Sequence, residues 1–226
     1  MVIAILGALS ALVFGSLCRA KAKARQAVCM GNLRQVNASV RMYADDSRDA
    51  LPSTSPSPPD FTAYLGLLRN GGTASASPGN DKVYACPADT FHYDIPTMAR
   101  AYRIATPVHK MPGMNGTSYA FNAGNFPYGP AHSPRWPGIG GWKSGSVRDP
   151  SRTLLVFEYP ALIPYSWHRP AAKPGHHNNA ECVVSYVDGH VAYTRMYWDE
   201  ANAKGDHLEA WQYDPPPEYA YRWSGE

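Results

Sequence analysis

The sequence predicts an α+β fold in which a long N-terminal helix packs on a small antiparallel β-sheet head with long loops. No proline interrupts residues 1–45, and the second half of this stretch has helical periodicity. Two β-branched runs flank Asp188-Gly189, a pattern typical of a β-hairpin. Proline, glycine and tyrosine are plentiful elsewhere, which indicates a loop-rich body. We therefore expect an N-terminal helix over 1–50 and a globular head over 51–226.

The N-terminal helix divides into two parts. Residues 1–25 hold an apolar run and then a basic segment without a one-sided pattern, so this part is expected to protrude from the head. Residues 26–47 are expected to pack on the head through a stripe with steps of four and three: Cys29, Leu33, Val36, Val40 and Tyr43. As a helix, residues 2–17 reach about 24 Å. This length is slightly short of a bilayer core of about 30 Å.

The body is predicted from shorter patterns. The Ser/Pro-rich segment 52–59 is typical of a linker, and residues 60–70 indicate a short helix that ends at Gly71. Strands are expected at residues 82–86, 117–122 and 153–159. The aromatic and proline-rich C-terminal tail is expected to wrap the surface or contact a partner.

The hairpin is predicted to turn at Asp188 and Gly189, a pair that accepts the positive φ angles of a type I′ turn. With a two-residue turn, one face of the hairpin carries Cys182, Val184, Tyr186, Val191 and Tyr193. Because this face is the more apolar one, we expect it to lie against the long helix.

Residues 2–46 resemble the N-terminal helix of type IV pilin-like proteins, including the pseudopilins of type II secretion. The similarity lies in the apolar run and in RAKAKAR, CMGNLRQ and MYADD, which follow it in order. In the body, ACPAD, TSYAFN, DPSRTLLVFE and VSYVDGHV resemble elements of a subgroup that ends in an H-x9-DG motif. Ten residues separate His177 from Asp188 here instead of nine. The last thirty residues or so match no element of the family.

The family has a basic leader, a cleavage-site glycine and a short mature start before the apolar run. This chain begins at Met1, inside that run. The resemblance therefore implies either a start placed too far downstream or a truncated form.

The resemblance implies a structural subunit of an extracellular helical filament, a homo-oligomer assembled through its apolar helix. Before assembly the helix would lie in the inner membrane with the head outside the cytoplasm, and pilus or secretion machinery would assemble it. The filament-core helix would use Ile3, Ile5, Leu6, Leu9, Leu12, Val13, Phe14 and Leu17.

Charge is distributed unevenly along the chain. Residues 1–44 carry six basic side chains and no acidic one, whereas the remainder has a small acidic excess. The basic helix and acidic body could attract one another between neighbouring subunits. No nucleic-acid-binding motif or basic face occurs in the body, so no nucleic-acid partner is expected.

Four cysteines, at positions 18, 29, 86 and 182, allow three full pairings. None forms a CxxC motif, which excludes a zinc ribbon or a thioredoxin site. A bond between Cys29, on the inward stripe, and Cys86, at the end of a predicted core strand, would join helix to head. Cys182 is the competing partner, and Cys18 is expected to be free or buried between subunits.

The alternative function is a membrane-anchored extracytoplasmic binding module or a metal-dependent hydrolase. It would use the one cluster able to hold a metal: His176, His177, Asp188 and His190. Asp188 is better explained as a turn residue, and no GxSxG, HExxH, Walker or Rossmann pattern occurs. We therefore expect a non-enzyme with no catalytic residue, no cofactor and no bound metal.

Overall fold

The computed structural model describes residues 2–53, 61–70, 81–97, 100–124, 137–163, 165–169, 180–198, 210 and 213–226, with only the backbone of residues 2–13, 70, 81, 94–97 and 100–102. The fold is α+β: one long N-terminal helix is combined with small antiparallel sheets. Its helices and strands are α1 (Val2–Asp46), α2 (Tyr64–Asn70), β1 (His92–Thr97), β2 (Arg100–Ile104), β3 (Tyr119–Phe121), β4 (Leu154–Glu158), β5 (Glu181–Tyr186) and β6 (Val191–Arg195).

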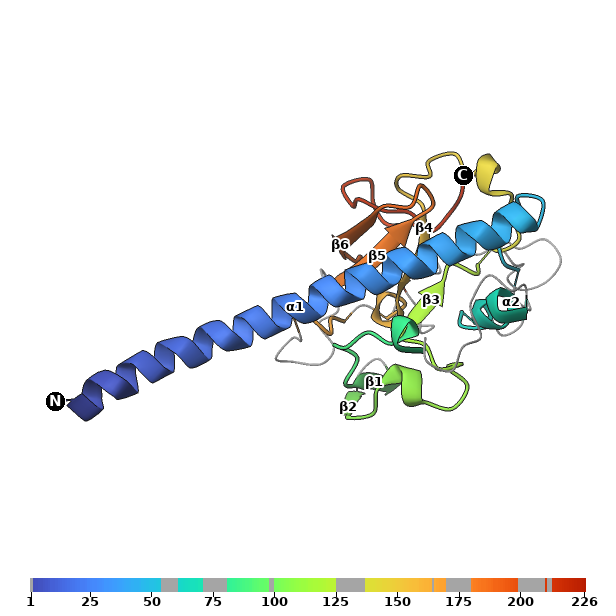
Figure 1. Ribbon diagram of the computed structural model, residues 1–226. Helices are drawn as coiled ribbons and strands as arrows, with labels where there is room; N and C mark the ends of the chain where they lie inside the picture. Colours follow the sequence, from blue (N-terminus) through green and yellow to red (C-terminus); the bar gives the residue numbers. More distant parts are fainter. Residues whose placement is uncertain are drawn as a thin grey trace.

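Helix α1 has 45 residues and spans about 68 Å at about 1.5 Å per residue. Figure 1 shows its second half lying across the head and its N-terminal half extending away from it. On the predicted stripe, the first four residues are fully buried, and Ala44 completes the stripe, since Tyr43 is only partly buried. Arg48 and Asp49 then adopt left-handed backbone angles (φ 57° and 66°), which reverse the chain after the helix.

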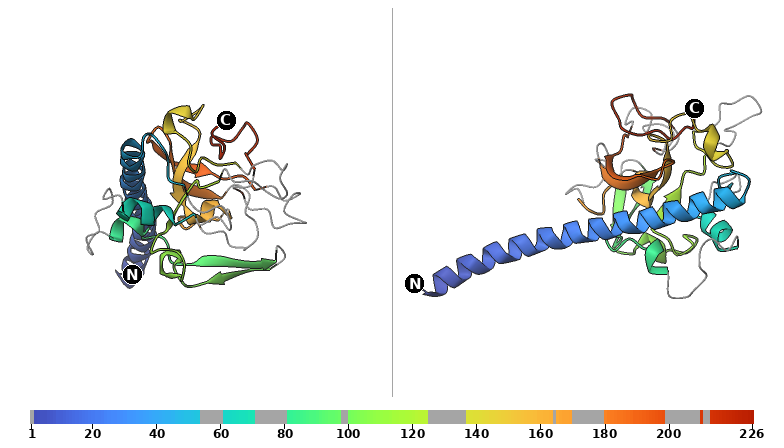
Figure 2. Two further views of the ribbon diagram at one scale, coloured as in Figure 1. Left: turned by 90° about the vertical axis from the view of Figure 1, so that its right-hand side faces the viewer. Right: turned by 45° about the horizontal axis from the view of Figure 1, so that its top comes forward.

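The main sheet has four antiparallel strands in the order β3-β4-β5-β6, and it lies between α1 and the C-terminal segment (Figure 2). All five residues of β4 are buried. On the side away from α1, Trp223 is fully buried and its ring meets that of Phe157 edge-on at 5.0 Å. The tail was expected to wrap the surface or contact a partner, but these contacts make it part of the core.

A separate two-stranded sheet, formed by β1 and β2, projects from the side of the head (Figure 2). This hairpin was not predicted from the sequence. Pro96 lies within β1, and a proline inside a short run argues against a strand. A two-stranded hairpin has two edges, where proline is tolerated, so the general rule misleads at this position.

The predicted strand at residues 82–86 is wrong. Residues Asp81–Tyr84 form a 3₁₀ helix, η1. Asn32 on α1 donates hydrogen bonds to the carbonyl oxygens of Lys82 (3.3 Å) and Ala85 (3.2 Å). Because α1 takes up these backbone acceptors, the segment is fixed to the helix and pairs with no strand of either described sheet.

The hairpin of β5 and β6 exists, but its predicted turn type and register are wrong. Ser185 pairs with Val191, and the amide of Tyr186 donates to the carbonyl of His190 (3.0 Å), so three residues form the loop. Of the two predicted turn residues, only Gly189 has a positive φ (100°). This is the geometry of a type I turn followed by a glycine bulge.

The one-residue shift divides the predicted helix-facing set between the two faces of the hairpin. Val191 and Tyr193 pair with Ser185 and Val183 and share their face, whereas Cys182, Val184 and Tyr186 lie on the opposite one. Tyr186 lies on the side of the C-terminal segment, where its hydroxyl donates to the carbonyl of Ala220 (3.5 Å). Successive residues of a strand point to opposite faces of the sheet, so Cys182 and Val184 lie on the same face as Tyr186. Ser185, which was placed on the opposite face, contacts α1 instead.

We predict that Gly189→Ala lowers the free energy of unfolding by about 1–3 kcal/mol. A Cβ at this positive φ would also lie 2.5 Å from Nη1 of Arg41. Gly66→Ala is the matched control, because a Cβ there meets nothing within 4 Å and the site is helical. Urea unfolding of both variants checks the prediction, and equal stability of the two would contradict this turn geometry.

Candidate functional site

The candidate site is the long helix itself together with its junction to the head. From Phe14 to Val28 every α1 side chain is exposed except Gln26, which is intermediate. Phe14 and Leu17 are 68% and 60% exposed, and they are three positions apart in the sequence, so they lie on one face of the helix. Four basic side chains follow on this exposed segment: Arg19, Lys21, Lys23 and Arg25.

Most of the predicted filament-core residues lie outside the described side chains: Ile3, Ile5, Leu6, Leu9, Leu12 and Val13. Only Phe14 and Leu17 of that set are described, and both are exposed. Within the described part of the chain, no helix combines the length and the apolar character required to cross a membrane.

The docked half of α1 is held by polar contacts as well as by its apolar stripe. Asn37 is buried and donates to Oγ of Ser185 (2.9 Å) and to the carbonyl oxygen of Tyr186 (2.8 Å). One turn later, Nη1 of Arg41 donates to the carbonyl oxygen of Asp188 (3.2 Å). Together with Asn32, these residues attach successive turns of α1 to different segments of the head.

Cys29 and Cys86 form a disulfide that closes a sequence separation of 57 residues. It joins α1 to the segment after η1. Cys182, the competing candidate, is a free thiol buried in the core, and Cys18 is free and exposed. Burial raises the pKa of the Cys182 thiol well above its ordinary value, and the nearby Glu158 adds to this shift. Cys182 is therefore an unreactive core residue.

A buried pair of ionisable side chains lies beside the disulfide. Glu158, at the end of β4, is fully buried, and its Oε1 lies 2.8 Å from Nε2 of His168, whose side chain is 3% exposed. The same oxygen lies 3.3 Å from Sγ of Cys86, and Oε2 accepts the amide of Val183 (2.9 Å). Because a disulfide sulfur carries no proton, the contact with Cys86 is not a hydrogen bond.

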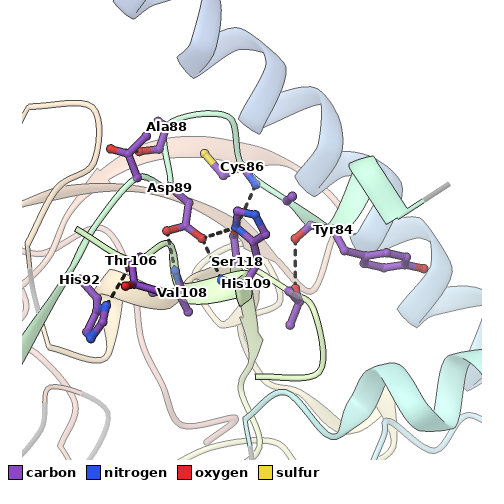
Figure 3. A network of polar contacts seen from close by, with 12 residues as sticks. Tyr84, Cys86, Ala88, Asp89, His92, Thr106, Val108, His109 and Ser118 are labelled. Carbon is purple, nitrogen blue, oxygen red and sulfur yellow. Dashed lines mark hydrogen bonds and ion pairs between the residues drawn. The ribbon is translucent and has the colours of Figure 1, made fainter. Parts of the chain in front are cut away.

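A second buried carboxylate, that of Asp89, organises the segment after Cys86 (Figure 3). It accepts hydrogen bonds from the amides of Val108 (2.8 Å) and His109 (3.0 Å) and from the hydroxyl of Ser118 (2.8 Å). Nδ1 of His109 lies 2.7 Å from the same carboxylate. The amide of Cys86 in turn donates to Oγ of Ser118 (3.0 Å). This network fixes the backbone that carries the disulfide.

The three residues Asp89, His109 and Ser118 do not have the geometry of a hydrolase triad. In a triad the serine binds the histidine nitrogen that faces away from the carboxylate. Here Ser118 binds the carboxylate directly and approaches only Nδ1 of His109 (3.4 Å), the nitrogen that already faces Asp89. The network therefore positions the backbone and offers no activated nucleophile.

Two members of the alternative metal cluster, Asp188 and His190, lie in the described part of the chain. Oδ1 of Asp188 lies 2.7 Å from Nδ1 of His190 and also accepts the amide of His190 (3.0 Å), which makes it a turn-stabilising carboxylate. The His190 ring stacks on Tyr186 at 4.0 Å. His176 and His177 lie outside the described residues.

The Glu158–His168 pair was not predicted from the sequence. A signal for Glu158 was present, because it ends the otherwise apolar run LLVFE of a strand predicted to be buried. His168 lies in a segment without periodicity, and nothing in its local sequence links it to Glu158.

Comparison of the chain with known protein families, with curated proteins and with solved structures finds no match.

We predict that Asn37→Asp destabilises the protein by about 1–3 kcal/mol or more, because a buried donor pair is lost and a carboxylate faces the Tyr186 carbonyl. Ser39→Ala is the control on the same helix, since its hydroxyl bonds only its own helical turn, at Gln35. Thermal unfolding checks the prediction. Equal melting temperatures for the two variants would show that Asn37 does not anchor the helix.

We predict that non-reducing peptide mapping recovers Cys29 and Cys86 in one linked pair of peptides. Replacing both by alanine should lower stability by about 2–5 kcal/mol, since the bond restricts a long loop in the unfolded chain. Cys18→Ser, at an exposed position, should leave stability unchanged. Recovery of both cysteines as free thiols from protein isolated without reductant would contradict the pairing.

Proposed function

We propose that this protein is a structural subunit of an extracellular helical filament, with a fold like those of type IV pilins and pseudopilins. The observation that carries the proposal is the division of α1. One half is embedded in the head through buried apolar and polar contacts, and the other half projects from it, with exposed side chains in its described part, residues 14–28.

The projecting half of α1 is suited to burial against other copies of the chain. Apolar residues on one face of a helix are normally buried against another protein surface, because most of the stability of a helix in a protein comes from packing of its apolar face. Phe14 and Leu17 are large and exposed, and the adjoining residues 2–13 are the most apolar of the sequence. Packing one subunit's projecting helix among those of its neighbours would cover these residues.

The shape of the subunit also favours an open assembly. The projecting helix and the head present different surfaces at opposite ends of the molecule (Figure 1). Contacts between unlike surfaces produce rings or helical filaments rather than closed two-fold dimers. In such a filament the basic side chains of residues 19–25 would lie near the mildly acidic heads of adjacent subunits, which provides attraction between them.

The proposal includes a membrane-bound stage with the head outside the cytoplasm, followed by transfer into the filament by pilus or secretion machinery. The disulfide supports this location, because such bonds persist mainly in oxidising compartments outside the cytoplasm. A binding module or hydrolase that uses the Asp188 cluster has less support, since this carboxylate already serves the hairpin turn.

We predict that Leu12→Asp in the full chain abolishes filament formation, because an unpaired charge in an apolar helix bundle is costly. Thr106→Asp, an exposed change on the head, is the matched control and should assemble as the unaltered chain does. Electron microscopy of material sheared from cells that express each variant measures the outcome. Normal filaments from Leu12→Asp would overturn the proposed function.

A further inference from the structure

We propose that reduction of the disulfide converts the helix–head junction into a zinc site formed by Cys29, Cys86, Glu158 and His168. The four side chains come from α1, from the segment after η1, from β4 and from the loop after it. Each offers one potential ligand atom, and these atoms all lie within 4.8 Å of one another. This second state of the junction does not depend on filament assembly.

The spacing of the four atoms is close to that of a tetrahedral zinc site. Zinc bonds of about 2.0–2.3 Å imply ligand atoms about 3.3–3.8 Å apart. The carboxylate oxygen of Glu158 is already 3.3 Å from Sγ of Cys86 and 2.8 Å from Nε2 of His168. Once their bond is broken, the two sulfur atoms need only separate to this spacing. The backbone of the four segments can therefore stay largely in place.

The donor set is also suitable. Two thiolates, one imidazole and one carboxylate are all zinc ligands, and a closed four-coordinate set is typical of structural zinc. Their three negative charges exceed the charge of Zn²⁺ by one, as in a Cys₃His site. The amide of Val183 already orients Glu158 through Oε2, which leaves Oε1 for the metal.

Stability of the fold alone does not explain why Glu158 and His168 are buried as a pair. Both side chains are almost completely removed from solvent, and Nδ1 of His168 has no hydrogen-bond partner among the described residues. Replacing a buried ionic pair by apolar residues is often neutral or stabilising, so the disulfide alone would join helix and head more simply. A metal ligand role explains why these two polar groups converge on the sulfur atoms.

The conversion balances chemically. A dithiol reductant transfers two electrons and two protons to the disulfide, giving two cysteine thiols while the reductant becomes a disulfide. Zn²⁺ then displaces both thiol protons and forms two zinc–sulfur bonds. The proton between Nε2 of His168 and Oε1 of Glu158 moves to Nδ1 of the same ring, which frees Nε2 and Oε1 to bind the metal. The junction would thus be cross-linked by a covalent bond when oxidised and by a metal ion when reduced.

The experiment uses the full chain, purified oxidised and then reduced with a phosphine reductant under anaerobic conditions. Co²⁺ is the probe, since tetrahedral thiolate coordination gives a characteristic visible and near-ultraviolet spectrum. We expect the reduced chain to develop this spectrum and to lose it when Zn²⁺ displaces the cobalt. The oxidised chain should show neither effect. The melting temperature of the reduced chain should rise with added Zn²⁺.

Matched variants separate ligation from a general effect on the fold. Glu158→Gln and His168→Gln should each weaken Co²⁺ binding by about tenfold or more. His190→Gln is the control, because His190 contacts the carboxylate of Asp188 as His168 contacts Glu158 but lies outside the cluster. Its cobalt spectrum and affinity should match those of the unaltered chain.

The proposal is overturned if the reduced chain gives no thiolate–cobalt spectrum, or if both Gln variants bind cobalt as tightly as the control. If reduction unfolds the chain, Zn²⁺ should restore its near-ultraviolet circular dichroism. Failure to do so would equally overturn the proposal. Loss of the zinc site would leave the filament proposal intact, because assembly is tested on the oxidised protein.

Discussion

The structure depends on one constraint: a single helix of 45 residues must be held to a small head by half of its length. A helix can bury only the stripe that faces its partner, and the head supplies a surface long enough for the part after Val28. The four-stranded sheet, the segment around η1 and the α1–head junction are all arranged around that stripe. The remaining half of α1 stays outside, and the need to cover it leads to the proposed assembly.

Apolar packing alone would hold the helix without fixing its position. A stripe of small and medium-sized side chains can be displaced by a turn, about 5.4 Å, and still meet an apolar surface. The polar contacts remove this freedom, because a displaced Asn37 would leave buried donors without Ser185 and the Tyr186 carbonyl. Asn32 and the disulfide act in the same way at the other end of the junction. Hydrogen bonds here specify position more than they add stability.

The sequence could predict those features that depend on local periodicity. The buried stripe of α1, the strand near residues 153–159 and the approximate position of the β5–β6 hairpin follow from spacing and composition. The hairpin register could not be predicted from the sequence, because Asp188-Gly189 suits both a two-residue turn and a glycine bulge. Packing of Ser185 on α1 decides between these two turns. The pairing of Glu158 with His168 was equally beyond reach, since it depends on how a strand end and an irregular loop meet in space.

The position of the disulfide connects the fold to the proposed assembly. Val28 is 50% exposed and Cys29 is fully buried, so the cross-link lies at the residue where α1 enters the head. In a filament, any force on the projecting helix would reach the head first at this residue, and a helix held there by packing alone would peel away turn by turn. A bond at Cys29 prevents that first step, and the Asp89 network holds Cys86, the other end of the bond, in place. A metal ion between the same two segments would resist peeling at the same point, which is why the two proposed states of the junction can serve one mechanical role.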